Sequence, residues 1–139
     1  MLRRELIAEL EGRFSAEEWA ALEDGSVSAE LVNEFNRSAL VRARHCETGL
    51  EDEIAGSEAR ELDAMLTDYM ATYMTERPAA QKYFVASCLS LAFVLNEPMH
   101  PVERVQAVAE ERDGRIIYHC PSKVVGERNI CDYCACESL

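Results

Sequence analysis

The sequence lacks an uninterrupted apolar stretch long enough for a signal peptide or a membrane span. Its first residues, MLRRELIAELEGRF, alternate charged and apolar side chains and predict the start of an amphipathic helix. The longest apolar run, residues 83–95, is interrupted by Ser87 and Ser90 and is shorter than the roughly 18 residues that a transmembrane helix needs. We therefore expect a cytoplasmic protein without membrane association.

Basic residues are scarce. The chain has 14 Lys and Arg against 26 Asp and Glu, which gives a formal net charge of −12. This balance opposes binding to nucleic-acid phosphates and to anionic membrane surfaces, because both need clustered basic side chains. The excess of acidic residues lies mostly in the first part of the chain. Residues 1–97 hold 9 basic and 19 acidic side chains, whereas residues 98–139 hold 5 basic and 7 acidic ones. Nucleic acid is therefore disfavoured, but four basic residues keep it as a third hypothesis: Arg112, Arg115, Lys123 and Arg128.

Short motifs of the common enzyme classes are also absent. The sequence contains no glycine-rich phosphate loop, no Gly-x-Ser-x-Gly and no His-Glu-x-x-His. The neighbouring residues His45 and Cys46 do not form a catalytic dyad with each other, because adjacent side chains on a helix point about 100° apart. Whether the chain is an enzyme therefore stays open at this level.

The composition is that of a folded chain. With 139 residues, of which 48% are hydrophobic, one domain can bury a core without disulfides. Helical patterns fill residues 1–97 and predict a mainly α fold, a bundle of about five helices. The first helix is predicted to end near Phe14. The second begins after Ser15, which forms a capping box with Glu18, and closes at Gly25.

Three further helices complete the predicted bundle. The third covers residues 28–44, with Ser28 as its N-cap. From Ser57 onward, apolar side chains recur at steps of three and one, which predicts one buried stripe on a helix that ends before Pro78. This stripe consists of Leu62, Met65, Leu66, Tyr69, Met70, Tyr73 and Met74. Residues 79–95 are apolar nearly all round and predict the central helix of the bundle.

The periodicity then changes to that of strands. Residues 105–111 and 115–120 predict the two strands of a β-hairpin, because the Asp-Gly pair between them tolerates the positive φ that a tight turn requires. We expect an acidic helical bundle over residues 1–97. A His-Pro turn, the hairpin and a cysteine-rich metal knuckle occupy residues 98–139 and form one structural unit with the bundle.

Six cysteines are present, four of them within the last 20 residues. In a reducing compartment, such cysteines are more often metal ligands than structural disulfides. Cys88, inside the apolar helix, is instead predicted to be a small buried hydrophobe. Cys131 and Cys134 have the Cys-x2-Cys spacing, and together with Cys120 at the end of the hairpin they direct three sulfurs at one ion. The three cysteines predict a metal site that needs a fourth ligand.

Three residues are candidates for the fourth ligand. His119 is disfavoured, because consecutive side chains on a strand point to opposite faces and it turns away where Cys120 faces the ion. His100 lies in a Pro-Met-His-Pro turn before the hairpin, from which it could fold over the site. Cys136 is close in sequence but shares its turn with Cys134, so that simultaneous binding is crowded. His100 and Cys136 both stay open.

Zinc is the metal that this donor set predicts first. An iron–sulfur cluster comes second, because four cysteines suffice in number but their spacing does not match the common ferredoxin runs. Thiols without metal, either reduced or redox-active, are the remaining alternative.

The tail resembles a known family. In order, it carries His-Pro, Tyr-x-Cys-Pro-x-Lys and Cys-x-aromatic-Cys motifs at His100-Pro101, Tyr118 to Lys123 and Cys131 to Cys134. These are similar to the motifs of the domain of unknown function 2115 family, found mainly in methanogenic archaea. The chain departs from that pattern after the His-Pro, where it reads Val-Glu-Arg-Val and family members usually have a glycine-rich stretch. The resemblance implies an archaeal host and favours His100 as ligand, but it implies no reaction.

These features predict a protein whose zinc site is structural and holds the hairpin against the bundle. A hairpin with so little core is marginal alone, and a structural zinc site contributes on the order of 10 kcal/mol to folding. We expect such a module to support binding of a protein partner, as an accessory or assembly factor. The alternative is a redox or catalytic protein that uses an iron–sulfur cluster, or a zinc with one open position, on the same cysteines.

Overall fold

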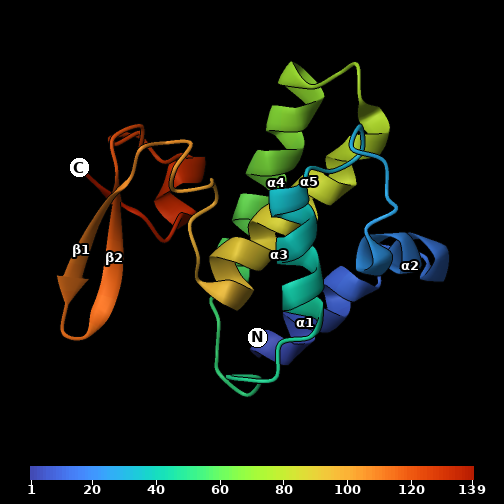
Figure 1. Ribbon diagram of the computed structural model, residues 1–139, viewed down its shortest axis with the longest axis horizontal. Helices are drawn as coiled ribbons and strands as arrows, with labels where there is room; N and C mark the ends of the chain where they lie inside the picture. The colour runs from blue at the N-terminus through green and yellow to red at the C-terminus, as the bar shows by residue number, and fades with distance from the viewer.

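The computed structural model describes all 139 residues, as five α-helices packed together and a small sheet at their side (Figure 1). The fold is therefore mainly α, as the sequence predicts. The helices are α1 (Arg3–Glu11), α2 (Ala16–Asp24), α3 (Glu34–Arg44), α4 (Gly56–Tyr73) and α5 (Gln81–Leu89). A 3-10 turn, η1 (Pro78–Ala80), precedes α5, and a π-helical segment, η2 (Ser90–Leu95), continues it.

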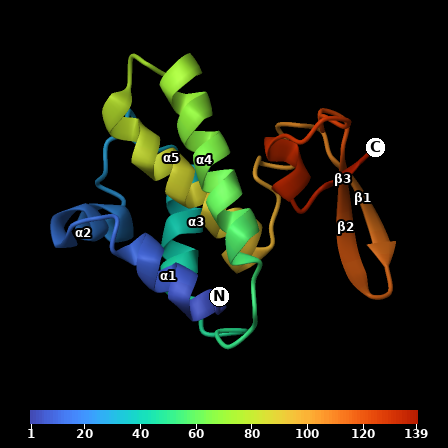
Figure 2. The ribbon, with the colours of Figure 1, turned by 180° about the vertical axis from the view of Figure 1, so that it is seen from behind.

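The C-terminal part contains three strands and one short helical turn. The strands are β1 (Val108–Arg112), β2 (Arg115–Cys120) and β3 (Glu137–Ser138), and the 3-10 turn η3 (Ile130–Tyr133) comes before β3. The sheet has the order β1-β2-β3. Figure 2 shows the sheet on the far side of α4 from α2, with η3 between the strands and the bundle.

The predicted boundary between the first two helices is confirmed. The Ser15 hydroxyl accepts a hydrogen bond from the Glu18 backbone N–H at 3.1 Å, and the Glu18 carboxylate accepts one from the Ser15 N–H at 2.8 Å. This reciprocal arrangement satisfies two N–H groups that the helix itself leaves unpaired. Gly25 follows α2 with φ of 80°, a left-handed conformation that glycine adopts without strain.

The predicted start of the third helix is wrong. Helix α3 begins at Glu34, and its N-cap is Asn33, whose side-chain oxygen accepts a hydrogen bond from the Asn36 N–H at 2.8 Å. Ser28 instead closes a separate turn, in which its carbonyl accepts from Leu31 N–H at 3.0 Å. Ser and Asn are both good N-caps, so local preference alone does not choose between two such positions five residues apart.

The predicted stripe on the fourth helix is only partly correct. Leu62, Leu66 and Met70 are buried, but the side chains of Tyr69 and Tyr73 are 44% and 67% exposed. The residues at intervals of four lie on one line along the helix, whereas each neighbour in sequence is rotated by about 100°. Steps of one residue therefore lead off the buried face. The two tyrosine rings contact each other there in a tilted arrangement, with 5.0 Å between ring centroids.

The central helix is apolar nearly all round, as predicted, and most residues of α5 and η2 are buried. The helix that contains the apolar run of residues 83–95 is longer than the run itself. The continuous helical segment Pro78–Leu95 has 18 residues and a mean hydropathy of 1.3, enough to cross a membrane by length and composition. This helical segment begins at Pro78, before the start of the apolar run at residue 83, which accounts for its greater length. Since 56% of it is buried among the other helices, it has the pattern of a bundle core.

The predicted hairpin is confirmed, although β1 starts at Val108 and not at Val105. Asp113 and Gly114 form its turn, with φ of 53° and 77°. Both values are positive, as the commonest two-residue hairpin turn requires. The segment before β1 forms turns instead, closed by a hydrogen bond from Ala107 N–H to the Val102 carbonyl.

The third strand was not predicted from the sequence. Two residues of β3 pair in parallel with β2, with Cys120 opposite Ser138 and His119 opposite Glu137. Such a short segment has no alternating pattern to reveal it. The pairing returns the chain end to β2 and thereby carries Cys136 next to Cys120.

The C-terminal part contacts the bundle through η3. The Tyr133 ring lies 6.2 Å from that of Phe93 in η2, and the Arg128 guanidinium pairs with Glu61 of α4 at 2.6 Å. Ile130 and Cys134 also pack against the core of the bundle. The cysteine tail is therefore attached to the helices by one face of a short turn.

Candidate functional site

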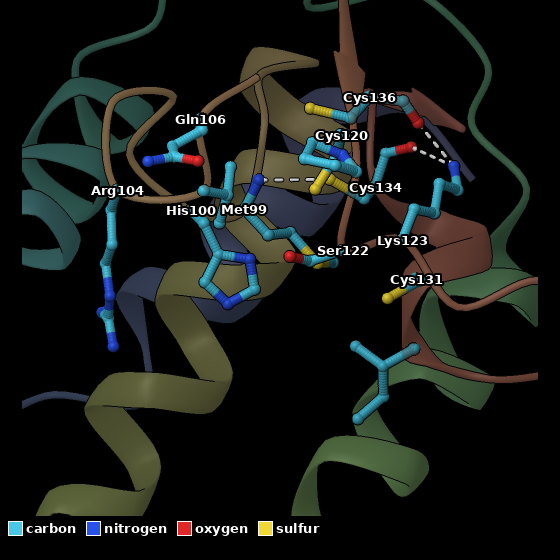
Figure 3. A pocket seen from close by; sticks show the side chains of 13 residues that line it. Met99, His100, Arg104, Gln106, Cys120, Ser122, Lys123, Cys131, Cys134 and Cys136 are labelled. Atoms are coloured by element: carbon cyan, nitrogen blue, oxygen red, sulfur yellow. Dashed lines mark hydrogen bonds between the residues drawn. The ribbon is translucent and has the colours of Figure 1, made fainter. Parts of the chain in front are cut away.

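One cavity of about 540 Å³ lies between the His-Pro turn, the end of β2 and the cysteine tail (Figure 3). Every residue that the sequence predicts as a metal ligand lines it: His100, Cys120, Cys131, Cys134 and Cys136. Three segments that are well separated in the chain contribute these side chains, so the grouping is tertiary. The two remaining cysteines, Cys46 and Cys88, are not in its wall.

The Cys-x2-Cys pair lies on a capped 3-10 turn. Asn129 precedes η3, and its side-chain oxygen accepts a hydrogen bond from the Cys131 N–H at 2.8 Å, while its own N–H donates to Asp132 at 2.9 Å. The Cys134 N–H then bonds to the Cys131 carbonyl at 3.1 Å. This turn brings both cysteines to the same cavity, as their spacing predicts.

Cys134 also connects the tail to the His-Pro turn. Its sulfur accepts a hydrogen bond from the Met99 backbone N–H at 3.3 Å, drawn as a dashed line in Figure 3. Met99 is 6% exposed and belongs to the core cluster of the bundle. Backbone N–H donors to cysteine sulfur are common around metal-bound thiolates, which they help to stabilise. This contact places the His100 turn beside Cys134.

Lys123 holds the tail from the other side. Its ammonium group donates hydrogen bonds to the backbone carbonyls of Cys134, at 3.4 Å, and of Cys136, at 2.5 Å (Figure 3). It lines the cavity and forms no ion pair with a carboxylate. In the sequence, Lys123 stands out only as part of a motif and as a basic residue. No local signal reveals its structural role, because the carbonyls it bonds lie more than ten residues away.

Cys136 is buried beside two of the other cysteines of the cavity. It is 3% exposed, and its burial together with the neighbouring Cys134 and Cys120 raises the pKa of its thiol to about 12. Burial likewise raises the pKa of Cys88 to about 12, with a further contribution from Cys134. Cys88 is 3% exposed, which confirms that it is a small buried core residue.

The two histidines of the tail behave differently. His119 turns away from the cavity, as predicted, and its Nε2 lies 2.6 Å from the Glu110 carboxylate, which raises the pKa of the imidazole. His100 lines the cavity, and burial together with the nearby Arg104 lowers its pKa. In Figure 3 its ring extends away from the Cys134 sulfur.

The donors fit a metal in kind but not in their present positions. Thiolates and an imidazole are the ligands that zinc and iron–sulfur clusters use. However, no three His, Cys, Asp or Glu side chains are grouped closely enough to hold one ion. Figure 3 shows the Cys131 side chain set apart from that of Cys134. A common coordination sphere therefore needs side-chain movement, and the metal stays a prediction.

The pair at the end of α3 has separate partners. His45 Nε2 lies 2.7 Å from the Glu23 carboxylate, and the Cys46 thiol donates to the Thr48 carbonyl at 3.3 Å. The two side chains therefore form no hydrogen-bonded dyad with each other. This agrees with the prediction from their adjacent positions in the sequence.

Comparison with protein-family models, with curated proteins and with solved structures finds no match to this chain. The resemblance of the tail to the domain of unknown function 2115 family therefore stays a prediction.

Proposed function

We propose that the C-terminal cysteines bind a structural zinc, which holds the small sheet against the helical bundle. The observation that carries the proposal is the gathering of four of the six cysteines, with His100, around one cavity. Core packing alone does not require four thiols and an imidazole from three segments to face the same space. A tetrahedral zinc site does require four such donors.

The scarcity of apolar core in this part of the chain gives the metal a role. Of the 28 buried residues, only three lie in residues 98–139: Met99, Cys120 and Cys136. Two of these three line the cavity as thiols. A structural zinc contributes on the order of 10 kcal/mol to folding, which is enough to order a segment that lacks its own core.

The second part of the proposal is a protein partner, for which this chain acts as an accessory or assembly factor. The C-terminal part exposes large apolar side chains that the bundle does not cover: Val108, Ile116, Val124, Val125 and Leu139. Val124 and Val125 are adjacent in the chain and exposed, and neighbouring exposed apolar groups of this kind can contribute to a binding surface. Nucleic acid is less well supported, because Arg112 pairs with Glu110 and Glu137 and Arg128 pairs with Glu61.

A redox or catalytic site is the second candidate, and the size of the cavity favours it. A closed structural zinc site leaves little free space, whereas this cavity measures about 540 Å³ and also contains Gln106, Ser122 and Arg104. Such a volume would admit an iron–sulfur cluster, or a zinc with one open position and a small substrate.

The first test is elemental analysis with a visible absorption spectrum on protein purified without oxygen. One zinc per chain and no colour is the expected result. Iron with sulfide and a brown chromophore would replace the leading proposal with the redox alternative. No metal at all would contradict both.

Variants then test whether the metal is structural. Replacing Cys131 and Cys134 together by Ser should abolish metal binding and remove hydrogen-exchange protection from β2 amides, while the helical circular dichroism of the bundle persists. Cys46→Ser is the matched control, because Cys46 lies outside the cavity. Retained protection in β2 after loss of the metal would contradict a structural role.

Single replacements separate the two candidates for the fourth ligand. His100→Ala and Cys136→Ala are compared for zinc stoichiometry and affinity. For a closed structural site, one of the two should weaken zinc binding strongly and the other little. If a variant in which both His100 and Cys136 are replaced by Ala still binds one zinc tightly, the site has three protein ligands and an open position.

A further inference from the structure

A second cavity, outside the cysteine tail, lies between the start of α3, helices α4 and α5 and the His-Pro turn. It measures about 480 Å³, within the range of about 300–1,000 Å³ that small-molecule sites occupy. Its apolar wall consists of three aromatic rings and three methionines: Phe35, Tyr69, Met70, Met74, Phe84 and Met99. We call it the aromatic pocket. The partly exposed Tyr69, which does not enter the core, is part of this wall.

The aromatic pocket contains an unpaired polar side chain. Asn36 is 7% exposed, and its backbone N–H bonds to Asn33, but its side-chain carboxamide forms no hydrogen bond within the chain. No side-chain nitrogen or oxygen in the protein is both unpaired and sealed from solvent. The Asn36 carboxamide therefore opens onto a cavity, and Asn36 lines this one together with a smaller neighbour of about 140 Å³.

A positive charge lies at the edge of the same pocket. Nine of the 14 Lys and Arg side chains form ion pairs with carboxylates, but Arg104 forms none. Figure 3 shows its side chain extending away from the cysteine sulfurs. A guanidinium group without a partner, in a chain with a net charge of −12, is suited to bind a carboxylate.

We propose that the aromatic pocket binds a planar aromatic monoanion, with its ring among the methionine and aromatic side chains and its carboxylate on Arg104. Methionine sulfur and aromatic rings both make favourable contacts with an aromatic face. The Asn36 carboxamide supplies a hydrogen bond to a polar ring substituent. The smaller neighbouring cavity contains Arg77 but also Glu30, so an anion is less favoured there.

The proposal does not depend on the metal. The two sites share Met99, His100 and Arg104, but the rings and the Asn36 carboxamide come from the bundle. Binding can therefore be measured on the full chain with whatever metal it retains on purification.

The test uses 2-naphthoate as the probe and the neutral 2-naphthamide as its matched control. Calorimetric titration of the wild type should give one binding site for 2-naphthoate and at least about ten-fold weaker binding of the amide. Arg104→Gln should reduce naphthoate affinity at least about ten-fold and leave the amide unchanged. Arg77→Gln is the matched variant and should bind naphthoate as the wild type does.

Methionine methyl resonances locate the bound probe. The chain has five methionines, of which Met70, Met74 and Met99 line the aromatic pocket while Met1 and Met65 do not. Naphthoate should shift the first three and leave the other two unchanged. Absence of saturable binding at millimolar concentration, shifts confined to Met1 or Met65, or equal losses in the Arg104 and Arg77 variants would overturn the proposal.

Discussion

The helical bundle and the C-terminal sheet are stabilised in different ways. In the bundle, helices α4 and α5 bury apolar residues such as Leu62, Leu66 and Leu89 almost completely. In the sheet, all five residues of β1 are exposed, and the contacts that hold the tail involve a Met99 N–H on sulfur and a Lys123 ammonium on carbonyls. The bundle is held by burial, whereas the sheet is held by its backbone pairing, by the contact of η3 with the bundle and by a few polar contacts.

This difference is matched by the distribution of cysteines, four of which line one cavity at the C-terminal end. A packed helical core tolerates little change, so its buried polar groups are few; two of them, Ser87 and Ser90, donate to backbone carbonyls, and the third, Asn36, borders the aromatic pocket. The sheet has no such constraint, and its cysteines line a cavity instead of filling a core. The end without a core is therefore the end at which a bound metal has the most to contribute.

The largest effect should come from a cavity in the bundle. Leu66 is 1% exposed, and Leu66→Ala should lower the free energy of unfolding by about 2–5 kcal/mol, because the packed helices cannot close the space. Guanidinium denaturation followed by circular dichroism measures it. The matched change in the sheet is Ile116→Ala, at a residue 62% exposed, which should cost less than about 0.5 kcal/mol. Equal costs would abolish the distinction between the two regions.

An intermediate effect should come from removing the ammonium group that holds the tail. Lys123→Met keeps much of the side-chain length but leaves the Cys134 and Cys136 carbonyls without their donor. If the cysteines bind zinc, affinity should fall about 10-fold to 100-fold, measured by competition with a chelator. Arg115→Met, at a basic residue that does not line the cavity, is the control and should not change affinity.

A smaller effect should come from a helix cap far from the site. Ser15→Ala removes the acceptor for the Glu18 N–H and should lower the free energy of unfolding by about 1 kcal/mol. Zinc affinity should not change, since α2 does not contact the sheet. A parallel loss of metal binding would mean that the bundle and the sheet are more strongly coupled than their contacts indicate.

The smallest effect should be a pH dependence within the bundle. The Lys82 ammonium, together with the Ser15 backbone, lowers the pKa of Glu18 from 4.5 to about 2. Because the folded protein binds this proton less tightly than the unfolded chain, the contribution is present above pH 4.5 and is lost as the pH falls toward about 2. It should be below about 1 kcal/mol, since the pair is partly exposed. Glu18→Gln should reduce the loss of stability between pH 5 and pH 3 in urea titrations; an unchanged loss would contradict this assignment.

Much of the fold follows from local patterns. The Ser15 capping box, the apolar helix that contains Cys88 and the hairpin turn at Asp113 all depend on a few neighbouring residues, and each lies where the sequence predicts it. One error occurs where two local choices compete. Ser28 and Asn33 are both suitable N-caps, and only the packing of α3 against α5 decides between them.

The candidate site is predicted less completely. The sequence identifies the five potential ligands, because cysteine spacing and a His-Pro turn are visible along the chain. It does not reveal that Lys123 and Met99 hold the tail, nor that β3 returns Cys136 to β2. These contacts join residues distant in sequence, and no periodicity records them.

The sequence by itself therefore determined the helices, the hairpin turn, the charge balance and the set of sulfur and imidazole donors, because each depends on residue type and short-range spacing. Only the tertiary structure decided which donors share a cavity, that His119 bonds to Glu110, and that Tyr69, Asn36 and Arg104 border a second pocket. The physical reason is that a cavity is the space left unfilled between packed elements. Its lining therefore depends on how the elements pack together and not on the sequence of any one element.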